Sequence, residues 1–276
     1  MMTFWKLLNL EVKRLVIPFV IMAIMVAAVQ MYGAHAMARH TENEAKEIMA
    51  REKLATVQQL EELHGLASYA DVIRINQSPW IILPIGLCIA FLLFYLFFVW
   101  YRDFIGKHSF MSRLLMVPAS RHHIYFAKLF APLLVIFALL AVQLLVLPVE
   151  NRYYNSLLPD EMRVEYPLNY LISAIPFLRK LIPLSAEQFA FNYGMGIAAV
   201  IVLYTGVLLE RSFRLLGLFG AIVYAVAAVY IATIPLGLGD HWFFYEKARL
   251  LAGIISVIGA LSLWLSLYLL KRKITV

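Results

Sequence analysis

Six long apolar runs divide this 276-residue chain, and none of them contains an Asp, Glu, Arg or Lys residue. The runs are Leu15–Tyr32, Trp80–Tyr101, Leu129–Leu147, Phe189–Leu209, Leu215–Pro235 and Leu250–Leu270. Each is near the ~20 residues that an α-helix needs to cross ~30 Å of hydrocarbon. Hydrophobic residues make up 63% of the chain, whereas an ordinary soluble domain is roughly half apolar. The sequence therefore predicts an all-α integral membrane protein with about six transmembrane helices.

The expected organisation is a single transmembrane domain over residues 1–276. The six membrane helices are expected at 15–35, 80–101, 129–147, 189–209, 215–235 and 250–270. Residues 36–79 and 148–188 would then form helical or interfacial segments on one side of the membrane. Residues 102–128 would form the long loop on the other side.

The charges sort by side, which predicts the orientation. The side that holds both termini carries thirteen basic and three acidic residues, and the other side carries eleven basic and fourteen acidic residues. Loops on the cytoplasmic side are enriched in Lys and Arg. The termini are therefore expected in the cytoplasm, and the basic residues, which lie at the ends of apolar spans, do not indicate nucleic acid as a partner.

The segments on either side of the first apolar run have helical patterns. Thr3–Arg14 alternates at helical spacing, as in a cytoplasmic amphipathic helix over residues 1–14 that lies in the membrane plane; a simple extension of the first span fits equally well. Thr41 and Glu44 have the form of a capping box, which predicts an external helix over Thr41–His64 that Gly65 terminates.

The apolar stretch Leu168–Leu181 is interrupted by Pro176 and is too short to cross the membrane. Arg179 and Lys180 would each cost ~2.5–3.5 kcal/mol near the bilayer centre. This pattern favours an interfacial or partly re-entrant helix.

Sequence motifs of catalysis and metal binding are missing. The chain has no His-Glu-x-x-His, no Gly-x-Ser-x-Gly and no phosphate-binding glycine loop, and its single cysteine, Cys88, cannot form an internal disulfide. His35 and His40 lack helical ligand spacing and are expected at a solvated surface. No catalytic, cofactor-binding or metal-ligating residue is therefore expected, and the chain is not expected to be an enzyme.

The loop between the second and third runs has the most specific pattern. Apolar residues alternate with Lys and Ser residues over Phe104–Met116, which predicts a short amphipathic helix beneath the membrane, and Pro118 then ends that helix. Ser120 is positioned to cap the next helix.

The whole stretch Tyr101–Lys128 resembles the corresponding segment in permease subunits of type-2 ABC exporters. In that family an acidic residue ends the second span, a coupling helix follows, and a Leu-Pro-x-Ser-Arg-like turn leads to a Lys at the foot of the third span. The corresponding positions in this chain are, in the same order, Asp103, Ser109–Met116, Val117–Arg121 and Lys128. The opening segment Phe4–Arg14 also looks like the family's N-terminal segment.

The resemblance implies partners rather than chemistry in this chain. It implies a dimer of ABC ATP-binding subunits, which would bind ATP and magnesium, and a second permease subunit, identical or related, within the lipids of a bacterial plasma membrane. The residues expected to contact the ATPase subunit are Asp103, Lys107, Ser109, Phe110, Met111, Arg113, Leu114 and Leu115. Many family members place external helices between the fifth and sixth spans, where this chain has a short loop.

An apolar or amphipathic cargo, such as an antimicrobial peptide or a drug, is expected because flexible Met and aromatic side chains suit such molecules. Met22, Met25, Phe91 and Tyr95 are the candidate residues of the substrate pathway. Small residues in the fourth and fifth runs, among them Gly217 and Gly220, permit close helix packing. Two other classes stay open: a sensor or assembly protein that binds a partner through Thr41–His64, and a membrane enzyme that acts on lipids.

Overall fold

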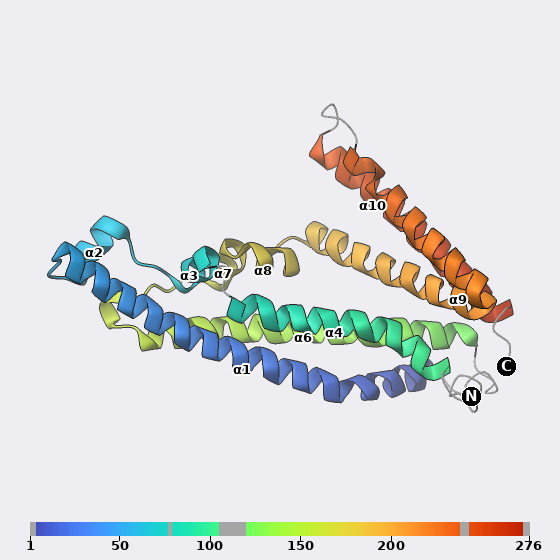
Figure 1. The fold of residues 1–276 in the computed structure, drawn as a ribbon, viewed down its shortest axis with the longest axis horizontal. Coiled ribbons are helices and arrows are strands. Elements are labelled where there is room, and N and C mark those ends of the chain that lie inside the picture. The colour runs from blue at the N-terminus through green and yellow to red at the C-terminus, as the bar shows by residue number, and fades with distance from the viewer. Residues whose placement is uncertain (1–3, 77–78, 105–119, 238–242, 273–276) are drawn as a thin grey trace. The chain divides into compact units, whose positions relative to one another are not determined.

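The computed structural model describes residues 4–76, 79–104, 120–237 and 243–272, and these residues form helices and short connections without a β-strand (Figure 1). The helices are α1 (Phe4–Glu52), α2 (Val57–His64), α3 (Tyr69–Asn76), α4 (Pro79–Phe104), α6 (Arg121–Leu157), α7 (Leu168–Ala174), α8 (Pro176–Leu181), α9 (Ala186–Thr233) and α10 (Phe244–Arg272), with 3-10 turns η1 (Asp160–Met162) and η2 (Ile234–Gly237). Among these described residues, six helical segments are long and apolar enough to cross a membrane. The protein is a multi-pass, all-α membrane protein.

The chain forms two compact units, and three helices contribute to both. Unit 1 consists of Met1–Leu15, Leu92–Leu134 and Ser185–Val276. Unit 2 consists of Val16–Phe91 and Val135–Leu184. The loop 102–128 thus belongs to unit 1, whereas the segments between the first and second spans and between the third and fourth spans belong almost entirely to unit 2.

The first helix is one continuous element. Its 49 residues are about 74 Å long at 1.5 Å per residue, more than twice the ~30 Å of a bilayer core. The separate segments expected at 1–14, 15–35 and 36–79 therefore differ from the structure, in which the N-terminal residues extend the first span. The prediction that a helix begins at Thr41 is wrong, because Thr41 lies inside α1 and its Oγ1 donates to the Met37 carbonyl at 3.0 Å.

The helix break comes later, between α1 and α2. Lys53 adopts a left-handed φ of 57° directly after the last residue of α1. Thr56 then caps α2, since its side chain accepts a hydrogen bond from the Gln59 N–H, and Gly65 with φ 72° follows the last residue of α2. The N-cap is thus a threonine with a Gln three residues on, the same signature as a capping box but fifteen residues after Thr41.

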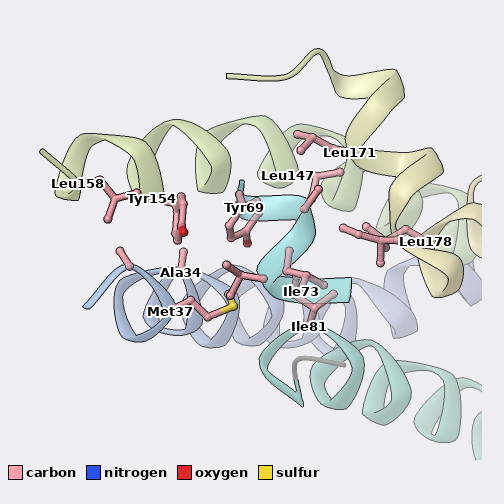
Figure 2. Packing of buried hydrophobic residues seen from close by; sticks show 14 of the residues in the cluster. Ala34, Met37, Tyr69, Ile73, Ile81, Leu147, Tyr154, Leu158, Leu171 and Leu178 are labelled. Carbon is pink, nitrogen blue, oxygen red and sulfur yellow. The ribbon is translucent and has the colours of Figure 1, made fainter. Parts of the chain in front are cut away.

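The core of unit 2 joins segments that are distant in the sequence (Figure 2). Apolar side chains from the second half of α1, from α2 and α3, from the start of α4 and the end of α6, and from α7 and α8 are buried together. Labelled members are Ala34, Met37, Tyr69, Ile73, Ile81, Leu147, Tyr154, Leu158, Leu171 and Leu178. The segments 36–79 and 148–188 thus build a shared folded domain rather than two separate external segments.

Helices α7 and α8 complete this core. The stretch expected to form one interfacial helix is two short helices, with Pro176 at the first position of α8, where a missing N–H costs nothing. Leu171, Ile172 and Leu178 are at most 2% exposed within the protein. One face of these two helices is therefore covered by the protein, and their position at the membrane interface stays a prediction.

Buried polar groups inside unit 2 are arranged in pairs. The Tyr69 hydroxyl donates to the Glu150 carboxylate at 3.0 Å, and the Tyr154 hydroxyl donates to Thr41 Oγ1 at 3.0 Å. Gln30 Nε2 donates to Gln143 Oε1 at 3.1 Å. Such interhelical hydrogen bonds between groups withdrawn from water fix the register of the helices that carry them.

Within unit 1, α9 contains the fourth and fifth spans and reverses direction between them. In a straight helix, residues 206 and 221 would lie about 22 Å apart. A Cβ atom on Gly206 would instead lie 3.6 Å from the Ala221 Cβ, so the two arms of α9, Ala186–Phe213 and Leu215–Thr233, fold against each other. Gly217 makes the turn possible, because a Cβ there would overlap the Leu209 carbonyl.

Helix α10 packs on the first arm of α9. A Cβ on Gly259 would lie 3.5 Å from that of Ala198. Thr205 Oγ1 is 2.8 Å from Ser266 Oγ and donates to the Ser262 carbonyl at 3.1 Å. Small and hydroxyl-bearing residues at helix contacts are typical of membrane proteins, because lipid offers no hydrophobic driving force for association.

Candidate functional site

Charged side chains from the ends of three helices meet inside unit 1. Glu11 comes from the start of α1, Arg102 and Asp103 from the last turns of α4, and Lys128 from the beginning of α6. Each lies within four residues of one of the apolar runs, where a charge can stay at the membrane boundary while its helix crosses the bilayer. With Arg14 these residues form what we call the ion cluster.

Lys128 is the centre of the ion cluster. Its ammonium group donates to Glu11 Oε1 at 3.2 Å and also pairs with the Asp103 carboxylate. A third hydrogen bond goes to the Val99 carbonyl at 3.2 Å, so all three ammonium protons have acceptors. Lys128 and Asp103 are each 1% exposed and Glu11 is 4% exposed.

Two arginines surround the buried carboxylates. Arg14 lies 3.3 Å from Glu11 and 3.4 Å from Asp103, and Arg102 lies 3.4 Å from Glu11 and 3.6 Å from Asp103. Both arginine side chains keep more than a quarter of their surface exposed. Three cations and two carboxylates give the ion cluster a net charge of +1, with the positive excess at its accessible side.

Aromatic rings pack next to the ion cluster. Lys128 lies 5.4 Å from the centre of the Trp100 ring, a cation–π contact. Tyr125 and Tyr204 pack against Trp100 with ring centres 6.1 and 5.6 Å away. The Tyr204 hydroxyl donates to the Lys128 carbonyl at 3.0 Å. Trp100, Tyr125 and Tyr204 are fully buried, and opposite charges attract more strongly beside buried rings than in water.

The start of α6 is also attached to the end of α10. Arg121 donates hydrogen bonds to the carbonyls of Leu270 at 2.7 Å and Lys271 at 3.1 Å. These carbonyls belong to the last turn of a helix, where intrahelical donors are missing and a cation is favoured. The helix ends on both sides of residues 105–119 are therefore tied to other parts of unit 1.

The ion cluster is suited to mechanical linkage rather than to chemistry. Its carboxylates are occupied by cations and its lysine has three acceptors, so neither a general base nor a nucleophile is free to act. Among the described residues, no group of three or more His, Cys, Asp and Glu side chains has the arrangement of a metal site. What the arrangement can do is hold the ends of α1, α4 and α6 together as one body.

The structure places the expected ATPase-contact residues as follows. Asp103 is buried and paired with Lys128, since a carboxylate at this depth requires a nearby cation; its contact with an ATPase subunit stays a prediction. The other expected contacts lie outside the described residues: Lys107, Ser109, Phe110, Met111, Arg113, Leu114 and Leu115.

The four expected pathway residues are divided between the two units. Met22, Met25 and Phe91 belong to unit 2, where Met22 is buried and Phe91 is 37% exposed. Tyr95 belongs to unit 1, is 5% exposed, and has the Arg102 guanidinium 5.9 Å from its ring centre. Tyr95 thus accompanies the ion cluster.

Sequence reasoning did not identify Glu11, Arg14 or Arg102 as site residues, although a signal existed. Glu11, Asp103 and Glu210 are the acidic residues on the side that is expected to hold both termini and to be strongly basic. The structure pairs the first two with Lys128, and the Tyr101 hydroxyl donates to Glu210. A carboxylate retained where topology favours positive charge is a good indicator of a specific partner.

Comparison with known proteins adds no identification. No protein-family model matches the chain, and no curated protein or solved structure matches it.

Proposed function

We propose that this chain is the membrane-spanning permease subunit of an ATP-driven exporter of the type-2 ABC class, with ATP bound and hydrolysed by separate subunits. The cargo would be a hydrophobic or amphipathic molecule. In this proposal both termini and residues 102–128 face the cytoplasm, and the packed core of unit 2 contributes to the opposite side of the plasma membrane.

One observation carries the proposal. Three motif positions that the resemblance assigns separately are the acidic residue ending the second span, the lysine at the foot of the third, and the N-terminal segment. In the structure they supply Asp103, Lys128 and Glu11 to a single buried cluster. Lys128 meets Asp103, which is 25 positions away in the sequence, and Glu11, which is 117 positions away. Such a meeting is unexpected if the motif positions match the family's positions by accident.

The cluster gives the proposed coupling a physical route. Residues 105–119 lie between Asp103 and Lys128, so the ion cluster holds the two helices that enter and leave this segment. A force that a closing ATPase applies to an amphipathic helix there would reach α4 and α6 together, because buried ion pairs resist separation. Helix-in-groove docking would bury the apolar side chains of the segment in the ATPase.

The test is co-purification. The double substitution Leu114→Asp with Leu115→Asp should release the ATPase subunit and abolish ATPase stimulation by the permease. The matched control is Leu63→Asp with Ile75→Asp, which changes two exposed apolar residues, 64% and 71% exposed, in unit 2. Retention of the ATPase by the first variant, with its stimulation intact, would refute the coupling assignment.

A second candidate function is partner binding without transport. The observation that favours it is the folded unit 2 core, which gives α2 and α3 a stable base and leaves Leu63 and Ile75 exposed. A sensor or assembly protein would lose its partner on the Leu63→Asp and Ile75→Asp change and would be indifferent to changes at Leu114 and Leu115. The same pair of variants therefore separates the two functions.

A further inference from the structure

An apolar cavity of about 570 Å³ lies in unit 1 among α4, both arms of α9, and α10. Small residues create it: Ala198, Gly206, Ala221, Ala225, Ala228 and Ala232 contribute to its wall. Its volume is within the range of sites that bind small molecules. The cavity opens at the surface of unit 1, because Leu218, Ile222 and Val229 in its wall are 45%, 55% and 63% exposed. An apolar chain that occupies it would gain dispersion contacts with the wall.

One end of the cavity is charged. Glu210 and Tyr101 belong to the wall, and the Tyr101 hydroxyl donates a hydrogen bond to the Glu210 carboxylate. The Arg211 guanidinium lies 4.7 Å from the centre of the Tyr101 ring. A second cavity of about 360 Å³ is lined by Glu210, Arg211, Leu215 and Leu218, and it shares Glu210 and Leu218 with the first.

The depth of this charged end follows from the topology. Glu210 and Arg211 lie at the reversal of α9, between the fourth and fifth spans, so they are at the level of lipid head groups while the apolar cavity extends along the spans. A ligand that fits must therefore have a hydrocarbon chain joined to a polar group at the membrane surface.

We propose that this paired cavity binds one membrane phospholipid with an amine-bearing head group. An acyl chain occupies the apolar cavity, the ammonium group lies at Glu210, and the phosphate lies at Arg211. A carboxylate and a guanidinium at neighbouring positions complement a zwitterionic head group, whereas a purely anionic head group meets repulsion from Glu210. This inference is independent of the proposed transport function, since it needs only the spans and their reversal.

The experiment uses the purified full chain and native mass spectrometry. Phosphatidylethanolamine and phosphatidylglycerol with identical acyl chains are added in equal amounts, and bound lipid is counted. The unaltered protein should retain one phosphatidylethanolamine in preference to phosphatidylglycerol. Glu210→Gln should reduce that preference several-fold while lipid is still bound, because it removes the charge and keeps an acceptor for Tyr101.

A steric pair tests the cavity itself. Ala225→Phe places a ring in the cavity and should expel the lipid, while Val226→Phe adds a comparable ring at the adjacent residue, which is 63% exposed and not in the wall, and should leave lipid binding unchanged. Thermal unfolding of both variants establishes that they fold.

Equal lipid retention by the two variants, or equal binding of the two phospholipids by the unaltered protein, would overturn the proposal. So would a change in oligomeric state in Ala225→Phe with lipid content unaltered, which would make the cavity an interface between copies.

Discussion

The Lys128 ammonium lies 3.2 Å from the Glu11 carboxylate, although 117 positions separate the two residues in the sequence. Both side chains are almost completely withdrawn from solvent. The pair attaches the beginning of the first helix to the foot of α6, and Asp103 attaches the end of α4 to the same ammonium group. The segment proposed to contact an ATPase therefore starts and ends at a fixed electrostatic joint.

Removal of the central cation should destabilise the protein strongly. Lys128→Met leaves two carboxylates buried beside only the peripheral arginines, and loss of one partner of a buried pair costs about 3–5 kcal/mol. A large fall in the thermal unfolding midpoint in detergent is expected. Lys6→Met, which removes an exposed lysine of the same helix region, should leave the midpoint unchanged.

A second substitution tests whether the charge imbalance is the cause. Lys128→Met combined with Asp103→Leu removes opposite charges together and should recover part of the lost stability. If the double variant is no more stable than Lys128→Met, packing rather than electrostatics accounts for the effect.

The reversal of α9 depends on the missing side chain of Gly217. Gly217→Ala would push a methyl group into the Leu209 carbonyl, whereas Gly220→Ala meets no atom within 4 Å. The first change should destabilise by about 1–3 kcal/mol, as overpacking does, and the second should be neutral or slightly stabilising because Ala favours helix. Thermal unfolding of the two variants is the measurement, and equal midpoints would contradict the observed turn.

The start of α2 can be distinguished from the start expected at Thr41. Thr56→Ala removes the side chain that accepts from the Gln59 N–H and should cost about 1 kcal/mol. Glu44→Ala, which the capping-box expectation would make harmful, should change stability by less than about 0.5 kcal/mol, because Glu44 is an exposed residue in the interior of α1. Hydrogen exchange at residues 57–64 locates the effect of the first change.

Tyr69 should confer an alkaline limit on the stability of unit 2. Burial, and then the negative charge of Glu150, raise the pKa of Tyr69 well above its usual value. A group whose pKa is raised on folding contributes stability that is complete below the unfolded pKa, about 10, and is lost as the pH rises through the folded pKa. Stability should therefore decline above about pH 10.

Tyr69→Phe identifies the residue responsible. This variant should lose about 1–3 kcal/mol near neutral pH, because Glu150 loses its hydroxyl donor, and its stability should decline less steeply above pH 10. Tyr166→Phe, a change at a tyrosine that is 38% exposed, is the matched control. An unaltered alkaline slope in Tyr69→Phe would contradict the assignment.

Local pattern predicted the membrane helices well. The length and purity of an apolar run are properties of consecutive residues, so runs such as Trp80–Tyr101 indicate a span without knowledge of any neighbour. Local signals were less reliable where a helix continues past the membrane. Nothing in the sequence near Thr41 distinguishes a helix start from a residue inside α1, because helix propensity allows both. In the structure the Thr41 side chain accepts a hydrogen bond from Tyr154, a partner that is distant in the sequence.

The sequence by itself determined that this chain is helical and has about six runs long and apolar enough to cross the membrane, because hydropathy acts residue by residue. Tertiary structure alone decided that Glu11, Asp103 and Lys128 share one cluster, that Gly217 permits α9 to reverse, and that the segments around Tyr69 and Tyr154 form a common core. These relationships join residues far apart in the chain, and their free energy exists only once packing has excluded water and brought the partners within contact distance.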